Sequence, residues 1–365
     1  MISATPFTIN NPAIPPIFAG RSDEISLIIR GLFQDHTSIA IYGNEAIGKS
    51  SILLTIHQHL VSENKIFSIE IPSIILRQAI QGNFLGLITG QICTAIWTRL
   101  LNKKTSDLIE DTMLYVRDRG DYIADADEDL IRRIYRLVTN TKLEGTGTEK
   151  NAFGGKMIIN AQSSHEKSMS FSRAPLSSTE FLDLIGELND IIKGYDYDSI
   201  LIVCDEMNHL PIATNTGILR EYLDAFSSKK IKFLLTLSNP SSYQKEDFDL
   251  LVEAFSAPFE IGHFKKIDAV KELIDNVLST SKNRKVDFSK SSYKTLFELT
   301  EGHPWWIQKI ANDAYSEILA SKRDGINSRI IEKNSQKYLA EIKLYKENMA
   351  AGRPFKKNML HALSF

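Results

Sequence analysis

The sequence has little cysteine, no long apolar run and no excess of charge of either sign. Its two cysteines, Cys93 and Cys204, are too few for a disulfide framework or a structural zinc site. No apolar stretch reaches the length of a membrane span, and Met1 to Pro16 lacks the features of a signal peptide, so we expect a cytoplasmic protein. A formal net charge of −2 gives no general attraction to nucleic acid or to acidic membranes.

The remaining composition is that of an ordinary globular protein. With 365 residues, 43% of them hydrophobic and 24% charged, the chain can bury a large core in two or three domains. We expect no membrane contact, and contact with nucleic acid would need a local basic patch. One such cluster is formed by Arg132, Arg133 and Arg136, and a solvated helix face explains it better than a nucleic-acid surface.

The most informative stretch runs from Ser38 to Leu60. A short apolar run ends in residues that fit the pattern G-x-x-x-x-G-K-[ST], and a segment rich in Leu and Ile follows. This setting of strand, loop and helix is typical of a Walker A phosphate loop, because glycine lets the backbone N–H groups approach a phosphate chain closely. The residues expected to bind nucleotide here are Gly43, Asn44, Glu45, Ala46, Ile47, Gly48, Lys49, Ser50 and Ser51.

Two residues of this loop have specific chemical roles. Lys49 would reach the β- and γ-phosphates, and the Ser50 hydroxyl would bind Mg²⁺. A chance glycine turn before a buried helix is the alternative, and the strand before the loop and the helix after it argue against that. We therefore expect ATP and Mg²⁺ as ligands.

A second strand carries acids at its end. Ser199 to Glu206 reads SILIVCDE, which predicts a buried parallel strand whose carboxyl end presents Asp205 and Glu206. Asp205 would bind Mg²⁺ directly or through its water, and Glu206 would polarise the water that attacks the γ-phosphate. The alternative is that these acids only cap a helix.

The next strand, Ile231 to Leu237, ends in polar residues. Asn239 or Ser238 could hydrogen-bond the attacking water at this strand tip, or both could only shape the turn before Pro240.

Earlier, residues 140–173 contain two alternating pieces that predict an inserted β-hairpin, with a structureless loop as the alternative. From Ile267 the chain is mostly helical, and His303 either stands beside a helix start or reaches the nucleotide.

Four features in this order resemble the STAND and archaeal-type ATPases of the AAA+ (ASCE) superfamily, which are relatives of origin-recognition initiators. They are Phe18-x-Gly20-Arg21-x-x-Glu24, the Walker A loop, the Asp205-Glu206 strand (Walker B) and Gly302-His303-Pro304 after a helix. The resemblance covers roughly residues 18–320, and the G-x-P segment is its most specific part. It implies a parallel five-stranded sheet with an extra strand between the two Walker strands, Arg21 near the adenine and Pro304 beside the base.

The sequence also departs from this family. The usual second-sensor arginine has no clear match, and no motif marks an arginine finger, although Arg173 and Arg220 are candidates. The chain also stops soon after the helices that follow the G-x-P segment. We therefore expect the effector to be a separate protein, or the C-terminal helices to serve as a docking element.

The expected fold class is α/β, a P-loop NTPase parallel sheet sandwiched by helices, with an inserted hairpin and a small all-helical lid domain. The expected parts are an N-terminal arm (1–17), a nucleotide-binding domain (18–264, insertion 140–173), a lid (265–325) and a C-terminal helix and tail (326–365).

The leading functional hypothesis is an ATP-hydrolysing switch that changes conformation or oligomeric assembly with nucleotide state. It would act through a partner, as STAND signalling proteins do, some of them in anti-phage defence. The alternative is a nucleic-acid-associated AAA+ loader, initiator or transposition regulator, which the near-neutral charge argues against. A third option, a protein that binds nucleotide without hydrolysing it, conflicts with Glu206.

Overall fold

A computed structural model of the chain describes most of its length. The described residues are 6–7, 9, 11–34, 38–62, 65–71, 84–108, 126–139, 155–157, 169–171, 178–207, 223–224, 226–238, 249, 252–253, 255, 257–281, 286–321 and 325–350. None of the helices within these ranges is both long and apolar enough to cross a bilayer.

The largest element is a parallel sheet of five strands in the order β2-β5-β6-β1-β7. Its strands are β1 (Ile39–Gly43), β2 (Ile66–Ile71), β5 (Ser199–Cys204), β6 (Ile231–Ser238) and β7 (Ala257–Glu260). Strand β6 lies between β1 and β5, so an extra strand does separate the two expected Walker strands. This arrangement is the predicted P-loop NTPase α/β fold.

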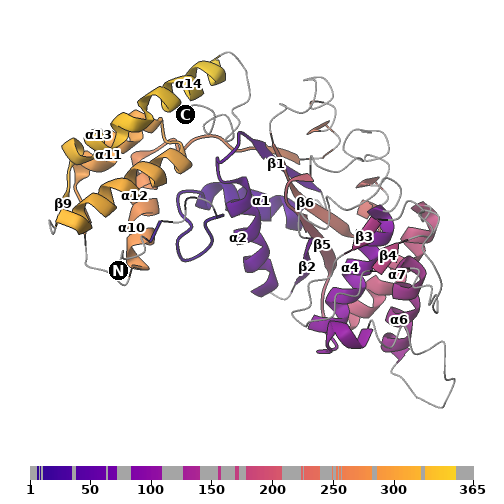
Figure 1. The fold of residues 1–365 in the computed structure, drawn as a ribbon. Coiled ribbons are helices and arrows are strands. Elements are labelled where there is room, and N and C mark those ends of the chain that lie inside the picture. Colours follow the sequence, from indigo (N-terminus) through magenta and orange to yellow (C-terminus); the bar gives the residue numbers. More distant parts are fainter. Residues whose placement is uncertain are drawn as a thin grey trace, which may run out of the picture.

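Helices cover both faces of the sheet because its strands are apolar on both sides (Figure 1). In β5, Leu201 and Val203 face one core, whereas Ile200 and Ile202 face the other, as the two-residue repeat of a strand requires. The first core is completed by α1 (Ser22–Gln34) and α2 (Lys49–Ser62). The second core is completed by α4 (Phe84–Arg99), α6 (Ala126–Thr139) and α7 (Ser178–Gly194).

The insertion contains the predicted hairpin. Strands β3 (Gly155–Met157) and β4 (Met169–Phe171) pair antiparallel, apart from the main sheet.

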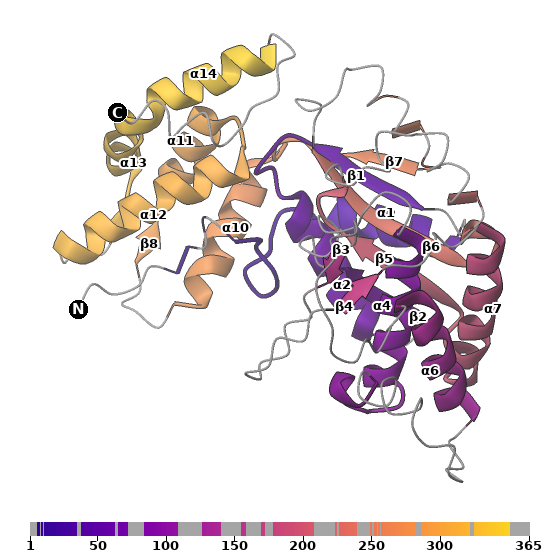
Figure 2. The same cartoon turned by 45° about the vertical axis from the view of Figure 1, so that its right-hand side comes forward.

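The C-terminal part forms a separate helical body beside the sheet (Figure 2). Its elements are α10 (Ile267–Ser279), β8 (Asp287–Phe288), α11 (Lys290–Thr300), α12 (Pro304–Ser321), β9 (Gly325–Ile326), α13 (Ser328–Ser335), the 3-10 turn η3 (Gln336–Tyr338) and α14 (Leu339–Ala350). A two-residue parallel pair, β8 with β9, joins the helices of this lid. Its apolar core continues to Tyr345, so we propose to count residues 265–350 as one unit.

The N-terminal arm connects this lid to the sheet. The Phe7 side chain is buried in the lid core, where its ring meets Tyr315 edge-on at 6.0 Å. Further along, the backbone N–H of Ala13 donates to the Ser51 hydroxyl on α2 at 2.9 Å. The arm therefore lies across the junction of the two bodies.

The basic cluster on α6 is not a solvated face throughout. The Arg132 side chain is buried, with its guanidinium 5.0 Å from the Trp97 ring centre and 3.4 Å from the Glu128 carboxylate. Arg133 is exposed and pairs with Glu187 at 3.2 Å. The prediction of a solvated face is wrong for Arg132, because an aromatic partner on α4 draws that side chain into the core.

Gly302 is predicted to be a stability-determining position. Its φ is 77°, and a Cβ added there would lie 2.3 Å from the Phe264 carbonyl oxygen. Gly302→Ala should lower the free energy of unfolding by about 2 kcal/mol, measured by urea denaturation. Gly194→Ala is the matched control, since its Cβ would meet nothing within 4 Å. Equal, small effects of both substitutions would contradict the close approach at Gly302.

Candidate functional site

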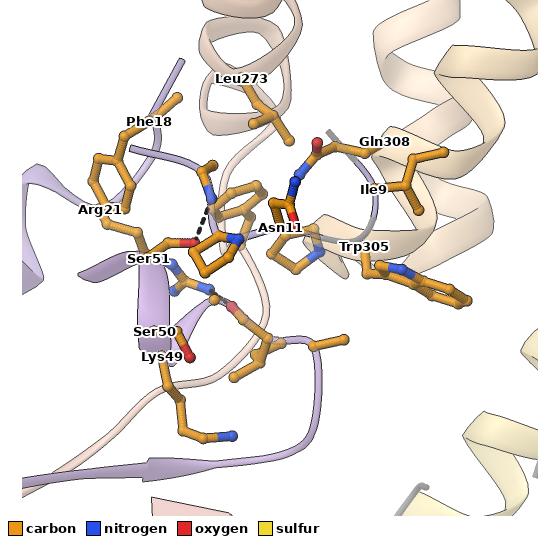
Figure 3. A pocket seen from close by; sticks show the side chains of 18 of the residues that line it. Ile9, Asn11, Phe18, Arg21, Lys49, Ser50, Ser51, Leu273, Trp305 and Gln308 are labelled. Carbon is orange, nitrogen blue, oxygen red and sulfur yellow. Dashed lines mark hydrogen bonds between the residues drawn. The ribbon is translucent and has the colours of Figure 1, made fainter. Parts of the chain in front are cut away.

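A cavity of about 390 Å³ lies where the carboxyl ends of the strands meet the lid (Figure 3). The phosphate loop contributes Ala46, Ile47, Gly48, Lys49, Ser50 and Ser51, and β5 leads into Asp205 and Glu206. The lid contributes Leu273, Pro304, Trp305 and Gln308, and the arm contributes Ile9, Asn11, Pro12 and Ala13. The predicted residues Arg21 and Pro304 therefore line the same cavity as the phosphate loop.

The phosphate loop has the geometry that its motif indicates. It connects β1 to α2, and Gly48 adopts a φ of 103°, which residues with a side chain rarely adopt. The loop delivers Lys49 and Ser50 to the first turn of α2, where helix N–H groups attract anions. Gly43, Asn44 and Glu45 belong to the same loop but do not line the cavity.

The Lys49 ammonium is buried and held by backbone oxygens. It donates to the carbonyl oxygens of Gly43 at 2.9 Å and Asn44 at 2.7 Å, and the side chain is 8% exposed. Burial lowers the pKa of Lys49 to about 8, although the carboxylates of Asp205, Glu45 and Glu206 oppose that shift. The ammonium is thus poised to exchange carbonyl oxygens for more strongly accepting phosphate oxygens.

Asp205 is the centre of the polar contacts in the site. Its Oδ1 accepts hydrogen bonds from the Ser50 hydroxyl at 3.1 Å, from the Thr236 hydroxyl, and from the Glu206 backbone N–H at 3.1 Å. Asp205 and Thr236 meet because both follow the alternation of their strands toward the α2 face, in neighbouring strands. The first turn of α2 and the ends of β5 and β6 are thereby joined through one oxygen atom.

Glu206 follows in an unusual backbone conformation. Its φ is 54°, and its N–H also donates to Thr236 Oγ1 at 2.9 Å. A non-glycine residue with positive φ is uncommon and is found at functional positions more often than elsewhere. Here the Thr236 hydroxyl and Asp205 hold the peptide that places Glu206 on the cavity wall.

Thr236 is the contact that sequence reasoning missed. It is a polar residue between two buried leucines near the end of β6, which was the available signal. The sequence instead indicated the strand tip: Ser238 is the last residue of β6, and Asn239 lies outside the described residues. Arg173 and Arg220 also lie outside them.

Arg21 holds the connection between the sheet and the lid. Its guanidinium donates to the carbonyl oxygens of Gly262 at 2.6 Å and Ile47 at 3.3 Å, and it stacks 4.7 Å from the Phe264 ring centre. Burial lowers the pKa of Arg21, and the Glu24 ion pair at 3.0 Å opposes this. These contacts support the phosphate loop and account for the position of Arg21 on the cavity wall. The contact with the adenine base that the sequence predicted would be additional to them.

His303 does not line the cavity. It is fully buried next to Pro304, and neither ring nitrogen has a hydrogen-bond partner in the part of the chain that the structure describes. Burial, together with the neighbouring His263, lowers its pKa to about 3, so the ring is neutral. The position of His303 therefore fits a residue beside a helix start and does not fit direct contact with the nucleotide.

The oxygen atoms of Ser50 and Asp205 fit a magnesium ion. Mg²⁺ prefers oxygen ligands and keeps several waters, so one hydroxyl and one carboxylate at 3.1 Å form a suitable protein contribution. Across the described ranges no group of three or more His, Cys, Asp and Glu side chains is placed to hold a metal. Ser50 and Asp205 would hold the ion, which would neutralise phosphate charge.

No protein-family model and no curated protein matches the chain. Solved structures resemble it at low identity. The ORC2 protein of Aeropyrum pernix is 13% identical, over 92% of this chain and 70% of that chain, with a TM-score of 0.47. A Walker-type ATPase of Pyrococcus abyssi is 12% identical, over 95% of this chain and 80% of that chain, with a TM-score of 0.48.

A third similar structure is the RuvB Holliday junction branch migration motor of Thermotoga maritima. It is 12% identical over 90% of this chain and 73% of that chain, with a TM-score of 0.42. The assignment of the P-loop NTPase fold rests on the strand order and the loop geometry.

Thr236→Val should impair both the fold and the site. Valine keeps the shape but removes the hydroxyl that joins Asp205 to the Glu206 N–H, so about 1–3 kcal/mol of stability should be lost. By analogy with residues that orient metal ligands, ATP turnover should fall about 10–100-fold. Thr236→Ser restores the hydroxyl and should stay near the parent in both urea denaturation and phosphate-release assays. Equal behaviour of the valine and serine variants would remove this role.

ATP affinity should weaken above about pH 8. The phosphates bind the charged form of Lys49, whose pKa is lowered to about 8, so binding at higher pH must first take up a proton. The Kd for ATP should therefore rise by up to about tenfold per pH unit above that value. Lys49→Arg keeps its charge and should show no such slope, whatever its own affinity. Calorimetric titrations from pH 7 to 10 measure this, and a flat parent profile would contradict it.

Proposed function

We propose that this chain is a Mg²⁺-dependent ATPase of the AAA+ type that works as a nucleotide-controlled switch. The observation that carries the proposal is the single Asp205 oxygen that joins Ser50, Thr236 and the Glu206 N–H beside the buried Lys49. The AAA+ assignment is supported by β6 between β1 and β5 and by a helical lid that follows the sheet.

In this proposal the phosphate loop binds and Glu206 carries out the chemistry. Lys49 and the first N–H groups of α2 would take the phosphate charge, and Ser50 and Asp205 would hold a Mg²⁺ ion, which would neutralise further phosphate charge. Glu206 orients a water and accepts its proton as the water attacks the γ-phosphate. Thr236 fixes the peptide of Glu206 before the reaction begins. The Glu206 carboxylate therefore does not have to be brought into position during the reaction.

The switch follows from where the cavity lies. Its walls come from the sheet domain and from the lid, which have separate apolar cores. A ligand that contacts both bodies favours whichever lid orientation binds it better, and ATP carries a γ-phosphate that ADP lacks. A separate partner would sense the lid orientation, and such a switch suits signalling roles, anti-phage defence among them.

Self-association would complete the site. Among the described residues Arg21 is the arginine that lines the cavity, and its guanidinium is held by the Gly262 and Ile47 carbonyl oxygens. We assign the remaining γ-phosphate charge to an arginine from a neighbouring copy, with Arg173 and Arg220 as candidates. An arginine supplied in this way raises turnover by about 10³–10⁵-fold in related chemistry.

Glu206→Gln is the direct test of this function. The amide keeps the shape but cannot accept the proton, so turnover should fall about 10²–10⁴-fold while ATP still binds. Glu260→Gln, at the exposed end of β7, is the control and should retain parental turnover. Phosphate release and calorimetry measure the two quantities, and parental turnover by Glu206→Gln would disprove the assignment.

The same variant tests the switch. Glu206→Gln with ATP should elute as a larger species than with ADP, and turnover per parent chain should rise with protein concentration. Assembly that appears only on addition of DNA or RNA, and is lost as salt rises, would favour the nucleic-acid alternative instead. A monomer in both nucleotide states, with turnover independent of concentration, would disprove the switch.

A further inference from the structure

The last helix of the lid contacts the phosphate loop directly through Tyr345. This α14 residue is 2% exposed, and its hydroxyl hydrogen-bonds to the side chain of Asn44, the loop residue after Gly43. The same hydroxyl hydrogen-bonds to Nε2 of His263, in the segment that leads from the sheet into the lid. Tyr345 therefore touches the loop and the connecting segment at once.

The direction of these hydrogen bonds can be assigned. His263 Nδ1 lies 3.1 Å from the Glu301 carbonyl oxygen, which can only accept, so Nδ1 carries the proton. Burial lowers the pKa of His263, so the ring is neutral and Nε2 accepts from the Tyr345 hydroxyl. The Tyr345 oxygen then accepts from the Asn44 amide. One chain of donors runs from the phosphate loop through α14 to the end of α11.

The neighbours of Tyr345 keep its ring in place. The His303 ring packs edge-on against it at 4.9 Å and against His263 at 5.2 Å. Next to Tyr345 in the chain, Lys346 forms an ion pair with Glu301 at 2.9 Å. These contacts fix Tyr345 on the lid side. If Asn44 moves, the Tyr345 hydroxyl therefore cannot move freely with it.

Lys49 connects this contact to nucleotide. Its ammonium holds the Asn44 carbonyl oxygen at 2.7 Å, so it restrains the peptide whose side chain meets Tyr345. A charged phosphate oxygen is a stronger acceptor for an ammonium group than a carbonyl oxygen is. Binding of a triphosphate would draw the ammonium away and release the Asn44 peptide.

We propose that Tyr345 is a latch that holds the lid on the phosphate loop and is weakened when a nucleoside triphosphate takes Lys49 from Asn44. The proposal rests on the nucleotide site proposed above. Tyr345 is a positioning residue in this scheme, since it acts through Asn44. Coupling is reciprocal, so a contact that triphosphate weakens must in turn oppose triphosphate binding.

Tyr345→Phe tests the latch because it removes the hydroxyl and keeps the ring. The full-length variant should bind the non-hydrolysable analogue AMPPNP about 3- to 10-fold more tightly than the parent, the range expected for one lost hydrogen-bonding group. Tyr338→Phe is the matched control: it lies in the same lid core, but its hydroxyl donates to Asp313 within the lid. Its affinity should equal that of the parent.

Hydrogen exchange of residues 339–350 gives a second readout, which does not depend on a measured affinity. In the parent, AMPPNP should speed exchange of these amides, whereas in Tyr345→Phe they should exchange fast already and respond little. Unchanged or weaker AMPPNP binding by Tyr345→Phe, or no exchange response in a parent that binds AMPPNP, would overturn the latch alone. A parent that does not bind AMPPNP would overturn both the latch and the proposed function.

Discussion

The candidate site depends on one carboxylate oxygen, Oδ1 of Asp205. It accepts hydrogen bonds from the Ser50 hydroxyl, the Thr236 hydroxyl and the Glu206 N–H, and so connects the start of α2 with the ends of β5 and β6. Parallel strands present their carboxyl ends along one edge of the sheet, which is why residues far apart in the chain can share this atom. The positive φ of Glu206 is maintained by the same contacts.

A second set of contacts joins the sheet to the lid. Arg21 binds the Gly262 and Ile47 carbonyl oxygens, and the Phe264 N–H donates to the Gly302 carbonyl oxygen at 2.9 Å. The groups that make this connection are few, whereas the sheet domain and the lid each have a separate apolar core of many residues. A ligand bound among them can therefore bias the orientation of the lid at small cost in packing, which is the physical basis of the proposed switch.

Local patterns in the sequence were sufficient for much of this account. The phosphate loop was predictable because its glycines, Lys49 and Ser50 act within a few residues of one another. Helix α10 begins at Ile267, where the mostly helical part of the chain was expected to start. Helix α11 begins after Ser289, whose hydroxyl caps it by accepting from the Ser292 N–H.

Contacts between distant segments were not predictable in this way. Thr236 meets Asp205 only because β6 lies beside β5, and Tyr345 meets Asn44 only because the lid folds back on the loop. Arg132 was misjudged for the same reason, since its partner Trp97 lies on another helix. The residues that neighbour Thr236, Tyr345 and Arg132 in the sequence do not indicate which distant side chain each of them contacts.

The most direct test of the account is ligand-dependent stability of the parent and Lys49→Ala, measured by urea denaturation with and without Mg²⁺ and ATP. At an ATP concentration about one hundred times its Kd, the parent should gain about 2.7 kcal/mol in free energy of unfolding if only the folded state binds. Lys49→Ala should keep its helical circular dichroism and lose that gain. An equal gain in both proteins would contradict the assignment of a nucleotide site at the phosphate loop.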